Sequence, residues 1–592
     1  MSTATSRSAA GSEAIWFLVP AAATIVLLGD GALWVGGWLA AHLGGHGGAA
    51  PSWSWLLVVD VFRRGPAAAL PGMPLGLLWV CVVVIALLMI GALALLAVAA
   101  RALFKGSGAP ARAMASRKDL QEMSTKAAGK KARALRPSLR SNKTVAQQDR
   151  GLRLFKLMVG GAWLHMSWED VLVAFMAPRS GKSTALAIPA ILEAPGAVIA
   201  TANKSDLVLA TRALRQKDTN CPAGLFDPMG IMHEPQAIWF DLLSGVRGVA
   251  DANAVAEHFM ATARDDSRGA DFWSSAAHDL LASLILAAAC TPGRTLHDVY
   301  TWLTNTVNPE PVELLRAAGH FPVAGSVAGR QGGAPETRDG IYETARTAAA
   351  CLQDAAIMAW VTPQPDLGVF DPAGFVLSRQ MIYLLSKDAD GISAAPLVAA
   401  VTDQVLAAAT AQAERNGGRL DPPLVAVLDE AANICRIQRL PQLYSYAGSQ
   451  GIQLMTILQS WAQGEAVWGE KGMEALWGAS TVKVIGSGIQ DDKFAGRLSR
   501  LVGQRDVTQH SYTSGDRSRS TSTSTRRQDI LPVSEISALP KWQGLLLVTG
   551  RPVAMVAMVP WFRRPRADEI SQAHDTALRA LTERANNPVG AS

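Results

Sequence analysis

The stretch Val171-Leu-Val-Ala-Phe-Met-Ala-Pro-Arg-Ser-Gly-Lys-Ser-Thr184 decides the fold of this 592-residue chain. Its first five residues are apolar and predict a buried strand, and residues 185–192, which follow the stretch, predict a helix. A strand, a tight loop ending in Gly-Lys-Ser and a helix form the arrangement that cradles phosphate groups. The sequence therefore predicts an α/β domain with a phosphate-binding loop (P-loop).

The residues of this loop have separate expected roles. Gly181 lets backbone amides approach the phosphates, Lys182 contacts the β- and γ-phosphates, and the Ser183 hydroxyl ligates Mg²⁺. The expected ligands are thus ATP and Mg²⁺. The residues expected to bind the nucleotide are Pro178, Arg179, Ser180, Gly181, Lys182, Ser183 and Thr184. One position departs from the usual pattern, because Met176 stands where the first glycine is expected.

A second apolar strand, Leu424-Val-Ala-Val-Leu-Asp-Glu430, ends in two carboxylates. Asp429 is expected to hold Mg²⁺ through water, and Glu430 to polarise the attacking water. Gln459 follows a third strand, residues 452–458, and can sense the γ-phosphate, because ligands collect at the carboxyl edge of a parallel sheet. The expected catalytic residues are Lys182, Glu430 and Gln459, and the expected metal ligands are Ser183 and Asp429.

Further apolar runs alternate with helical patterns along the chain. Strand-like runs lie at residues 197–201, 224–226 and 381–386, and helical stretches at 204–215 and 392–415. This alternation predicts a doubly wound, mostly parallel α/β sheet.

Two apolar stretches precede this domain. Residues 14–43 carry one acid, Asp30, and residues 75–100 carry no charged residue. About 20 apolar residues in a helix cross a bilayer, because lipid offers no partner to bare backbone groups. We therefore expect residues 1–103 to form a membrane anchor with two transmembrane helices.

A basic segment follows the anchor. Residues 101–156 contain fifteen Lys or Arg and three acids. Such an excess beside a membrane helix stays on the cytoplasmic side, which places both termini and the bulk of the chain in the cytoplasm. The same charges could instead attract nucleic acid, and the sequence leaves both interpretations open. The five cysteines are scattered without a Cys-x-x-Cys pair, which argues against a zinc site or a disulfide framework.

Eight blocks of the sequence, in their order along residues 171–560, resemble the type IV coupling proteins, which are membrane-anchored relatives of hexameric DNA-pumping ATPases. The blocks are Ala177-Pro-Arg-Ser-Gly-Lys182, Thr201-Ala-Asn-Lys-Ser-Asp-Leu207, Phe226-Asp-Pro-Met-Gly230, Asp271-Phe-Trp-Ser-Ser-Ala-Ala277, Leu428-Asp-Glu-Ala-Ala-Asn433, Ile457-Leu-Gln-Ser-Trp-Ala-Gln463, Trp468-Gly-Glu-Lys-Gly472 and Leu531-Pro-Val-Ser-Glu-Ile536.

This resemblance implies a RecA-like P-loop ATPase domain with an inserted all-α domain, in a homo-hexameric ring with ATP between subunits. It also implies a place in the bacterial inner membrane, and as partners a relaxase–DNA complex and the channel proteins of a type IV secretion system. The helical apolar spacing of residues 277–290 and 342–360 agrees with the all-α insertion.

The expected division of the chain is a membrane anchor (1–103), a basic juxtamembrane linker (104–156), the first part of the nucleotide-binding domain (157–249), the all-α domain (250–364), the second part of the nucleotide-binding domain (365–565) and a flexible tail (566–592), with a flexible loop at 513–528.

One departure concerns catalysis between subunits. Members of the family often carry an arginine about ten residues before the position of Gln459, where this chain has Gly448-Ser449-Gln450. A cation that reaches a neighbour's nucleotide must then come from elsewhere, such as Lys471, Arg497 or Arg500.

The leading hypothesis is therefore a coupling ATPase that recruits substrate DNA and drives its transfer. Two alternatives stay open, namely a septal-type double-stranded DNA translocase that needs no secretion channel and a substrate-docking receptor that does not hydrolyse ATP.

Overall fold

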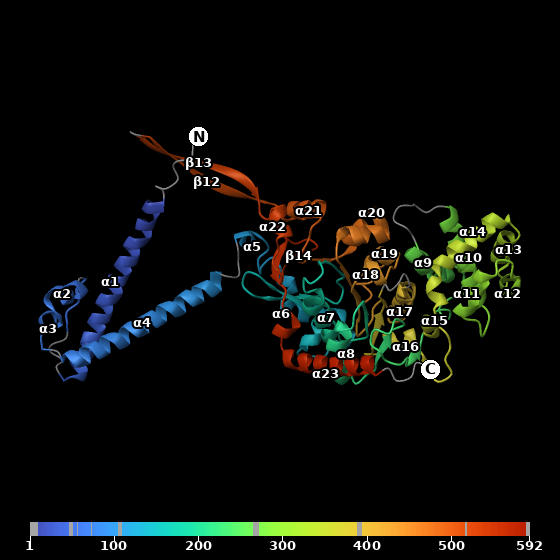
Figure 1. The fold of residues 1–592 in the computed structure, drawn as a ribbon, viewed down its shortest axis with the longest axis horizontal. Coiled ribbons are helices and arrows are strands. Elements are labelled where there is room, and N and C mark those ends of the chain that lie inside the picture. The colour runs from blue at the N-terminus through green and yellow to red at the C-terminus, as the bar shows by residue number, and fades with distance from the viewer. Residues whose placement is uncertain are drawn as a thin grey trace. The chain divides into compact units, whose positions relative to one another are not determined.

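The computed structural model describes residues 10–45, 51–55, 57–72, 74–104, 109–263, 272–387, 393–515 and 518–587 (Figure 1). Within the ranges discussed above, the residues outside this described part are 1–9, 46–50, 56, 73, 105–108, 264–271 (which include Asp271), 388–392, 516–517 and 588–592. The chain divides into two compact units, Met1–Gly108 and Ala109–Ser592.

The first unit is a small group of helices. Its helices are α1 (Ala10–Leu43), α2 (Leu57–Arg64), α3 (Pro66–Ala69) and α4 (Leu75–Phe104). Gly36 allows close packing of α1 on α4, because a Cβ at this position would lie 2.8 Å from Cγ2 of Val82. The Asp30 carboxylate is fully buried, and its Oδ1 accepts a hydrogen bond from Val58 N at 2.7 Å, at the start of α2.

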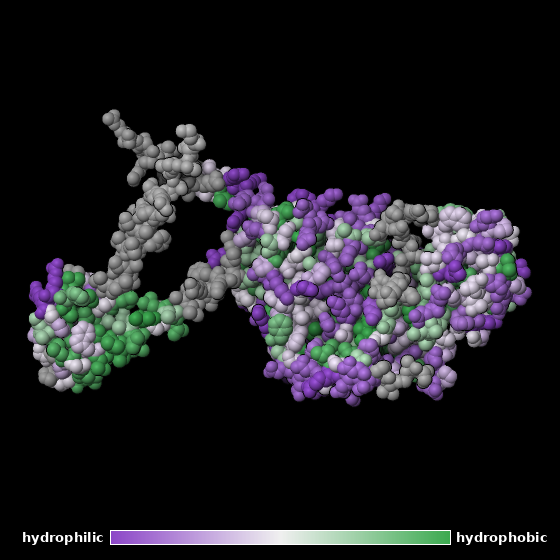
Figure 2. Space-filling view, viewed as in Figure 1, coloured by the Kyte–Doolittle hydropathy of each residue, from purple (hydrophilic) through white to green (hydrophobic). Residues whose placement is uncertain are grey.

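Helix α4 keeps much of its apolar surface exposed. The segment Leu75–Leu95 has a mean hydropathy of 3.0 and is long and apolar enough to cross a membrane. Side chains such as Leu87 and Leu95 are 64% and 72% exposed, and Figure 2 shows apolar surface over this helix. A second apolar helix of sufficient length, Phe272–Ala289, is mostly buried inside the all-α region of the other unit.

The second unit is built around an 11-stranded sheet with the order β2-β1-β15-β14-β11-β3-β10-β9-β4-β8-β5. Strands from β11 to β5 run parallel, and those from β14 to β2 pair antiparallel. The bounds are β1 (Leu152–Leu157), β2 (Trp163–Met166), β3 (Leu172–Phe175), β4 (Val198–Ala202), β5 (Ala223–Phe226), β8 (Met381–Leu385), β9 (Leu424–Leu428), β10 (Ile452–Leu458), β11 (Val482–Ile485), β14 (Gln543–Val548) and β15 (Ala554–Ala557). All strands predicted from the sequence lie in the parallel part.

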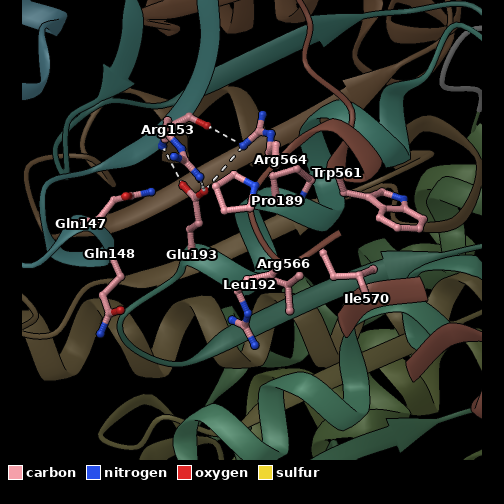
Figure 3. A pocket seen from close by; sticks show the side chains of 11 residues that line it. Gln147, Gln148, Arg153, Pro189, Leu192, Glu193, Trp561, Arg564, Arg566 and Ile570 are labelled. Atoms are coloured by element: carbon pink, nitrogen blue, oxygen red, sulfur yellow. Dashed lines mark hydrogen bonds and ion pairs between the residues drawn. The ribbon is translucent and has the colours of Figure 1, made fainter. Parts of the chain in front are cut away.

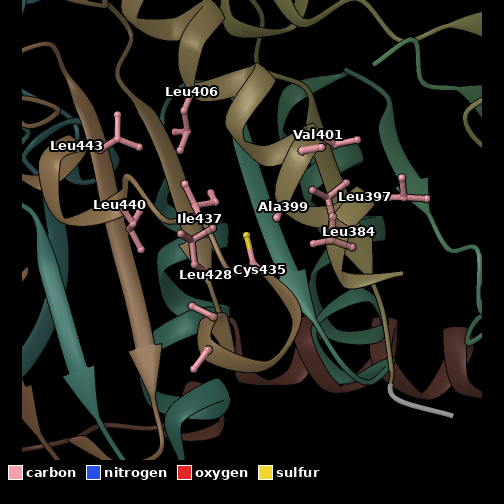
Figure 4. Close-up of a cluster of buried hydrophobic side chains, with 14 of the residues drawn as sticks. Leu384, Leu397, Ala399, Val401, Leu406, Leu428, Cys435, Ile437, Leu440 and Leu443 are labelled. Atoms are coloured by element: carbon pink, nitrogen blue, oxygen red, sulfur yellow. The ribbon is translucent and has the colours of Figure 1, made fainter. Parts of the chain in front are cut away.

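Helices cover both faces of the sheet, so that successive residues of a central strand enter different cores. In β3, Val173 and Phe175 belong to one apolar cluster, whereas Leu172 and Ala174 belong to the other. On the first face lie α17 (Ala395–Arg415), α18 (Ala431–Ile434), α19 (Leu440–Tyr444) and α20 (Trp461–Ala479), and on the second α7 (Ile188–Glu193), α8 (Asp206–Thr219) and α23 (Ala567–Asn586). Figure 4 shows part of the first core, where Leu384 of β8 lies beside Leu397 of α17 and Leu428 of β9 lies near Ile437.

The expected all-α domain, residues 250–364, contains helices and no strand among its described residues. The helices are α9 (Val249–Ala263), α10 (Phe272–Ala289), α11 (Leu296–Thr304), α12 (Glu310–Ala317), α13 (Phe321–Gln331), α14 (Pro335–Ala348) and α15 (Ala355–Ala359). Two short paired strands, β6 (Ile238–Trp239) and β7 (Gly368–Val369), lie just outside its two ends. They hold the entry and exit of the insertion together.

The expectation of a linker over residues 104–156 is wrong for its described part. Helices α5 (Ala109–Ala113) and α6 (Thr125–Leu135) precede β1, which is itself a strand of the main sheet. Leu120 and Leu139 are buried in the same apolar cluster as that strand. The many Lys and Arg residues of this segment indicate a solvated linker, but a minority of apolar residues among them pack in the core.

Two segments expected to be flexible have regular structure. The described residues of 513–528 belong to a hairpin of β12 (Gln504–Gly515) and β13 (Ser518–Asp529), while Arg517 lies outside the described residues. Most of the tail forms α23 and docks on the sheet unit, because Ile570 is buried and Arg584 Nη2 lies 3.0 Å from Glu234 Oε1.

Candidate functional site

The phosphate-binding loop leaves the sheet at the end of β3. Met176 N donates to Leu458 O at 2.9 Å, so this residue still belongs to the strand edge. The Met176 side chain is fully buried and fills the space beside Gly486, where a Cβ would lie 2.8 Å from its Cγ. The glycine missing at position 176 is thus compensated by a glycine on the neighbouring chain segment.

The top of the loop has the left-handed conformation that tight loops require. Gly181 has φ 98° and Arg179 has φ 62°. Ser183–Ala187 forms a π-helical turn that leads into α7, a distortion that is frequent at functional sites. Thr184 Oγ1 donates to Gly181 O at 3.1 Å, which fixes the start of this helix. Among the expected nucleotide-binding residues, Pro178 and Arg179 are exposed and Ser180 is buried.

The structure brings Lys182, Ser183, Asp429, Glu430 and Gln459 together. The Lys182 ammonium contacts Glu430 Oε1 and lies 3.5 Å from Asp429 Oδ1. Ser183 Oγ donates to Asp429 Oδ2 at 3.3 Å, and Gln459 Nε2 donates to Glu430 Oε2 at 2.5 Å. The Lys182, Asp429 and Glu430 side chains are only 12%, 7% and 6% exposed. Loop, β9 and β10 therefore converge on one shielded point at the carboxyl edge of the sheet.

The two carboxylates at this point have different surroundings. Burial raises the pKa of Asp429, against the opposing effect of Lys182. Glu430 has φ 57°, and its side chain also accepts a hydrogen bond from Asn433 Nδ2 at 3.0 Å. The hydroxyl oxygen of Ser183 and the carboxylate of Asp429 are the hard ligands that Mg²⁺ prefers, so these residues fit the expected metal.

Two residues that contact the site were not among the predicted site residues. Asn433 orients Glu430 and lies in the Leu428-to-Asn433 block, which was the available signal. Thr201 Oγ1 donates to Asp429 O at 2.8 Å from the end of the adjacent strand β4. Thr201 is the first residue of the Thr201-to-Leu207 block, which was the available signal for it.

The structure also accounts for the glycine at the position of the expected arginine. A Cβ at Gly448 would lie 2.1 Å from Glu169 O, so this backbone packs too closely for any side chain. Arg497 makes its contacts within this chain. Its Nη2 donates to Glu474 Oε2 at 2.9 Å, and its guanidinium lies 4.9 Å from the Trp461 ring centroid. Lys471 and Arg500 are exposed.

A cavity of about 280 Å³ lies beside α7, and neither Asp429 nor Glu430 is among the residues that line it (Figure 3). Its arginines are occupied by protein partners. Arg153 Nη2 donates to Glu193 Oε1 at 2.7 Å, Arg564 Nη1 lies 3.6 Å from the same oxygen, and Arg566 Nη1 donates to Asp218 Oδ2 at 2.7 Å. This cavity is therefore a junction between β1, α7 and the carboxy-terminal segment rather than an anion site.

Residues 423–541 match the family described as "TraM recognition site of TraD and TraG". No curated protein matches the chain.

Among solved structures, the unbound monoclinic form of the bacterial conjugative coupling protein TrwBdeltaN70 aligns with a TM-score of 0.52 and 17% identity, covering 69% of this chain and 88% of that one. The plasmid coupling protein TrwB in complex with ADP and Mg²⁺ aligns with a TM-score of 0.51 and 18% identity, covering 71% and 91%. Identities this low show a shared fold. The resemblance to the type IV coupling protein family is therefore confirmed, by the family match over residues 423–541 and by the fold of the sheet unit with its all-α insertion.

Proposed function

We propose that this chain is the coupling ATPase of a conjugative type IV secretion system, which hydrolyses ATP to drive transfer of substrate DNA. The observation that carries the proposal is the position of Glu430. This carboxylate is 6% exposed and is held by Lys182, Gln459 and Asn433 beside the phosphate-binding loop. An oriented, water-shielded carboxylate at this point is suited to polarise a water for attack on the γ-phosphate.

The contact between Lys182 and Glu430 suggests how hydrolysis depends on nucleotide. Lys182 neutralises Glu430 in the structure. The phosphates of a bound nucleotide compete with Glu430 for the Lys182 ammonium. Because the phosphates carry more negative charge and more oxygens, they favour a Lys182 that contacts them instead of Glu430. Glu430 then keeps the hydrogen bonds from Gln459 and Asn433 and becomes free to accept a proton from water. Mg²⁺, held by Ser183 and Asp429, would supply charge neutralisation on the phosphate oxygens.

The family match supports the proposed partners. The matched segment of relatives is described as a TraM recognition site, and we assign to residues 423–541 a contact with a protein of the DNA-processing complex. We also propose the homo-hexameric ring that the family resemblance implies, with α1 and α4 anchoring it in the bacterial inner membrane and the larger unit in the cytoplasm. Of these two helices, α4 contains the apolar segment Leu75–Leu95 that is long enough to cross a membrane.

The proposed division is an anchor over residues 1–108, a nucleotide-binding domain over 109–249 and 365–592, and the all-α domain over 250–364.

The test is hydrolysis of ATP by the full chain in detergent, with and without DNA. We expect Glu430→Gln to retain nucleotide binding and to lower kcat by about 10²- to 10⁴-fold, the usual contribution of a general base. Lys182→Ala should lose both binding and hydrolysis, and Lys126→Ala, an exposed lysine remote in sequence from the site, is the matched control.

The outcomes separate the candidate functions. Activity that rises with DNA and disappears in Lys182→Ala supports the motor. Nucleotide binding without hydrolysis under any condition would favour the docking receptor instead. In cells, DNA transfer that persists after deletion of the channel genes would favour the septal-type translocase.

A further inference from the structure

The sheet order defines two sides of the phosphate-binding loop. The loop follows β3, and Glu430 and Gln459 follow β9 and β10, which lie on one side of that strand. A triphosphate whose terminal phosphate points to Glu430 must direct its nucleoside the other way, because the chain of phosphates is roughly linear. The nucleoside therefore lies toward β11 and β14.

Trp542 occupies that side of the loop. It immediately precedes β14, and its indole packs directly on Gly181. A Cβ placed on Gly181 would lie 2.3 Å from Cζ3 and 2.9 Å from Cη2 of the indole. The three heavy atoms nearest to that Cβ all belong to this indole.

The backbone at Trp542 is held in an unusual conformation. Its φ of 70° is rare for a bulky residue, and such outliers concentrate at ligand sites. The carbonyl oxygen accepts a hydrogen bond from Met558 N at 2.8 Å, which fixes the residue between β14 and β15. The side chain is nevertheless only partly buried, so part of the indole remains accessible to a ligand.

Two neighbours extend this aromatic surface. The Phe562 ring lies 5.8 Å from the Trp542 ring at 85° and is 44% exposed. The Lys541 ammonium lies 4.8 Å from the centroid of the Trp542 ring and is exposed. A partly exposed aromatic pair with an adjacent cation suits a planar base attached to a phosphate chain.

We propose that Trp542, supported by Phe562 and Lys541, forms the nucleoside-binding face of the ATP site, with the indole stacking on the purine base. This proposal rests on the proposed function of the phosphate-binding loop. Stacking reads the π-surface of a base and not its hydrogen-bonding edge, so the site selects purine over pyrimidine nucleotides and separates ATP from GTP weakly.

The test compares Mg²⁺-ATP with Mg²⁺-tripolyphosphate, which has the phosphates but no nucleoside. Binding of each is measured by calorimetry on the full chain in detergent. Trp542→Ala should weaken ATP and GTP about tenfold or more and leave tripolyphosphate within about twofold, because only the base is lost as a partner. Trp542→Phe should keep most of the ATP affinity. Trp273→Ala, a 40%-exposed tryptophan of the all-α region, is the matched control and should change neither ligand.

Two results would overturn the assignment. One is an equal loss of ATP and tripolyphosphate affinity in Trp542→Ala, which would make the indole a mere support of the loop, and the other is unchanged ATP affinity. If Trp542→Ala does not fold, ATP with a photoreactive azido group on its purine ring provides the second measurement on the unsubstituted chain. The label should enter the peptide that carries Trp542 or Phe562, and labelling elsewhere contradicts the proposal. Failure of both ligands to bind the unsubstituted chain would instead refute the nucleotide site itself.

Discussion

Replacement of Arg136 by alanine tests whether the basic segment after α4 is part of the ATPase fold. The Arg136 side chain is 7% exposed. Its Nη1 donates to Asp149 Oδ1 at 2.5 Å, and its Nε donates to Asp421 Oδ1 at 2.9 Å. Asp421 precedes β9 and also accepts a hydrogen bond from Ser138 N at 2.7 Å. One guanidinium thus joins the segment before β1 to the strand that carries Asp429.

The magnitude follows from the burial of the partners. Removing one member of a buried ion pair costs about 3–5 kcal/mol, because the remaining charge is left uncompensated. Asp149 and Asp421 are 20% and 14% exposed, so water screens them in part and the lower end, about 3 kcal/mol, applies. Burial alone would raise the pKa of Asp421, but hydrogen bonds from Ser138 and Arg136 outweigh it and hold the pKa below its ordinary value.

The assay is urea unfolding of the full chain in detergent at pH 7, followed by circular dichroism. Arg140→Ala removes an exposed arginine of the same segment and should stay within about 0.5 kcal/mol of the parent. Arg136→Met combined with Asp149→Asn and Asp421→Asn should regain most of the loss, because no uncompensated charge remains. If the Arg136→Ala protein is as stable as the Arg140→Ala protein, the reasoning is refuted, because the segment before β1 then behaves as a linker that does not stabilise the ATPase fold.

Three further outcomes follow from the geometry. Burial lowers the pKa of His165 to about 4, so the unfolded chain takes up a proton at a higher pH than the folded chain does. The free energy of unfolding should therefore fall by about 3 kcal/mol as the pH drops from about 6.5 to 4. Unfolding midpoints measured across that range should show this loss, and the His165→Gln protein should show a smaller dependence on pH. Gln459→Ala should leave ATP binding intact and lower kcat about tenfold or more, because it removes a hydrogen bond that orients Glu430. Unchanged steady-state kinetics would exclude a role of Gln459 in orienting Glu430. Gly448→Ala should destabilise the fold by about 1–3 kcal/mol through its approach to Glu169 O, and a melting temperature equal to that of the parent would contradict this packing.

The parallel part of the sheet was predictable because of its burial. Strands covered on both faces read as continuous apolar runs, and Leu424–Leu428 and Ile452–Leu458 are fully buried along their length. The antiparallel part was not predicted. Leu152–Leu157 contains Arg153 and Lys156, and their charges made a strand of the main sheet resemble the basic segment around it.

The site was predictable where chemistry constrains the chain locally. Lys182, Asp429 and Gln459 each follow a recognisable strand, so sequence order alone placed them at one edge of the sheet. Trp542 follows no motif, because its position depends on β14 returning beside β11. Gly486 leaves the space that the Met176 side chain fills, and this arrangement was likewise not predictable. It depends on the packing of two segments that are far apart in the sequence.

Arg564 shows why the limits of the ATPase unit are harder to read than its centre. Its guanidinium is 4% exposed and donates to Arg153 O at 3.0 Å, to Leu154 O at 2.7 Å and to Ala185 O at 3.2 Å. One side chain near the carboxyl end therefore satisfies carbonyls of the first strand and of the turn that follows the phosphate-binding loop. Burial lowers the pKa of Arg564 to about 10, and the guanidinium still remains charged at neutral pH. Because β1 also pairs with β15, the two ends of the folded unit lie side by side in the sheet. Residues before and after the motif region are thus needed to fix the start of α7, although neither carries a motif of its own.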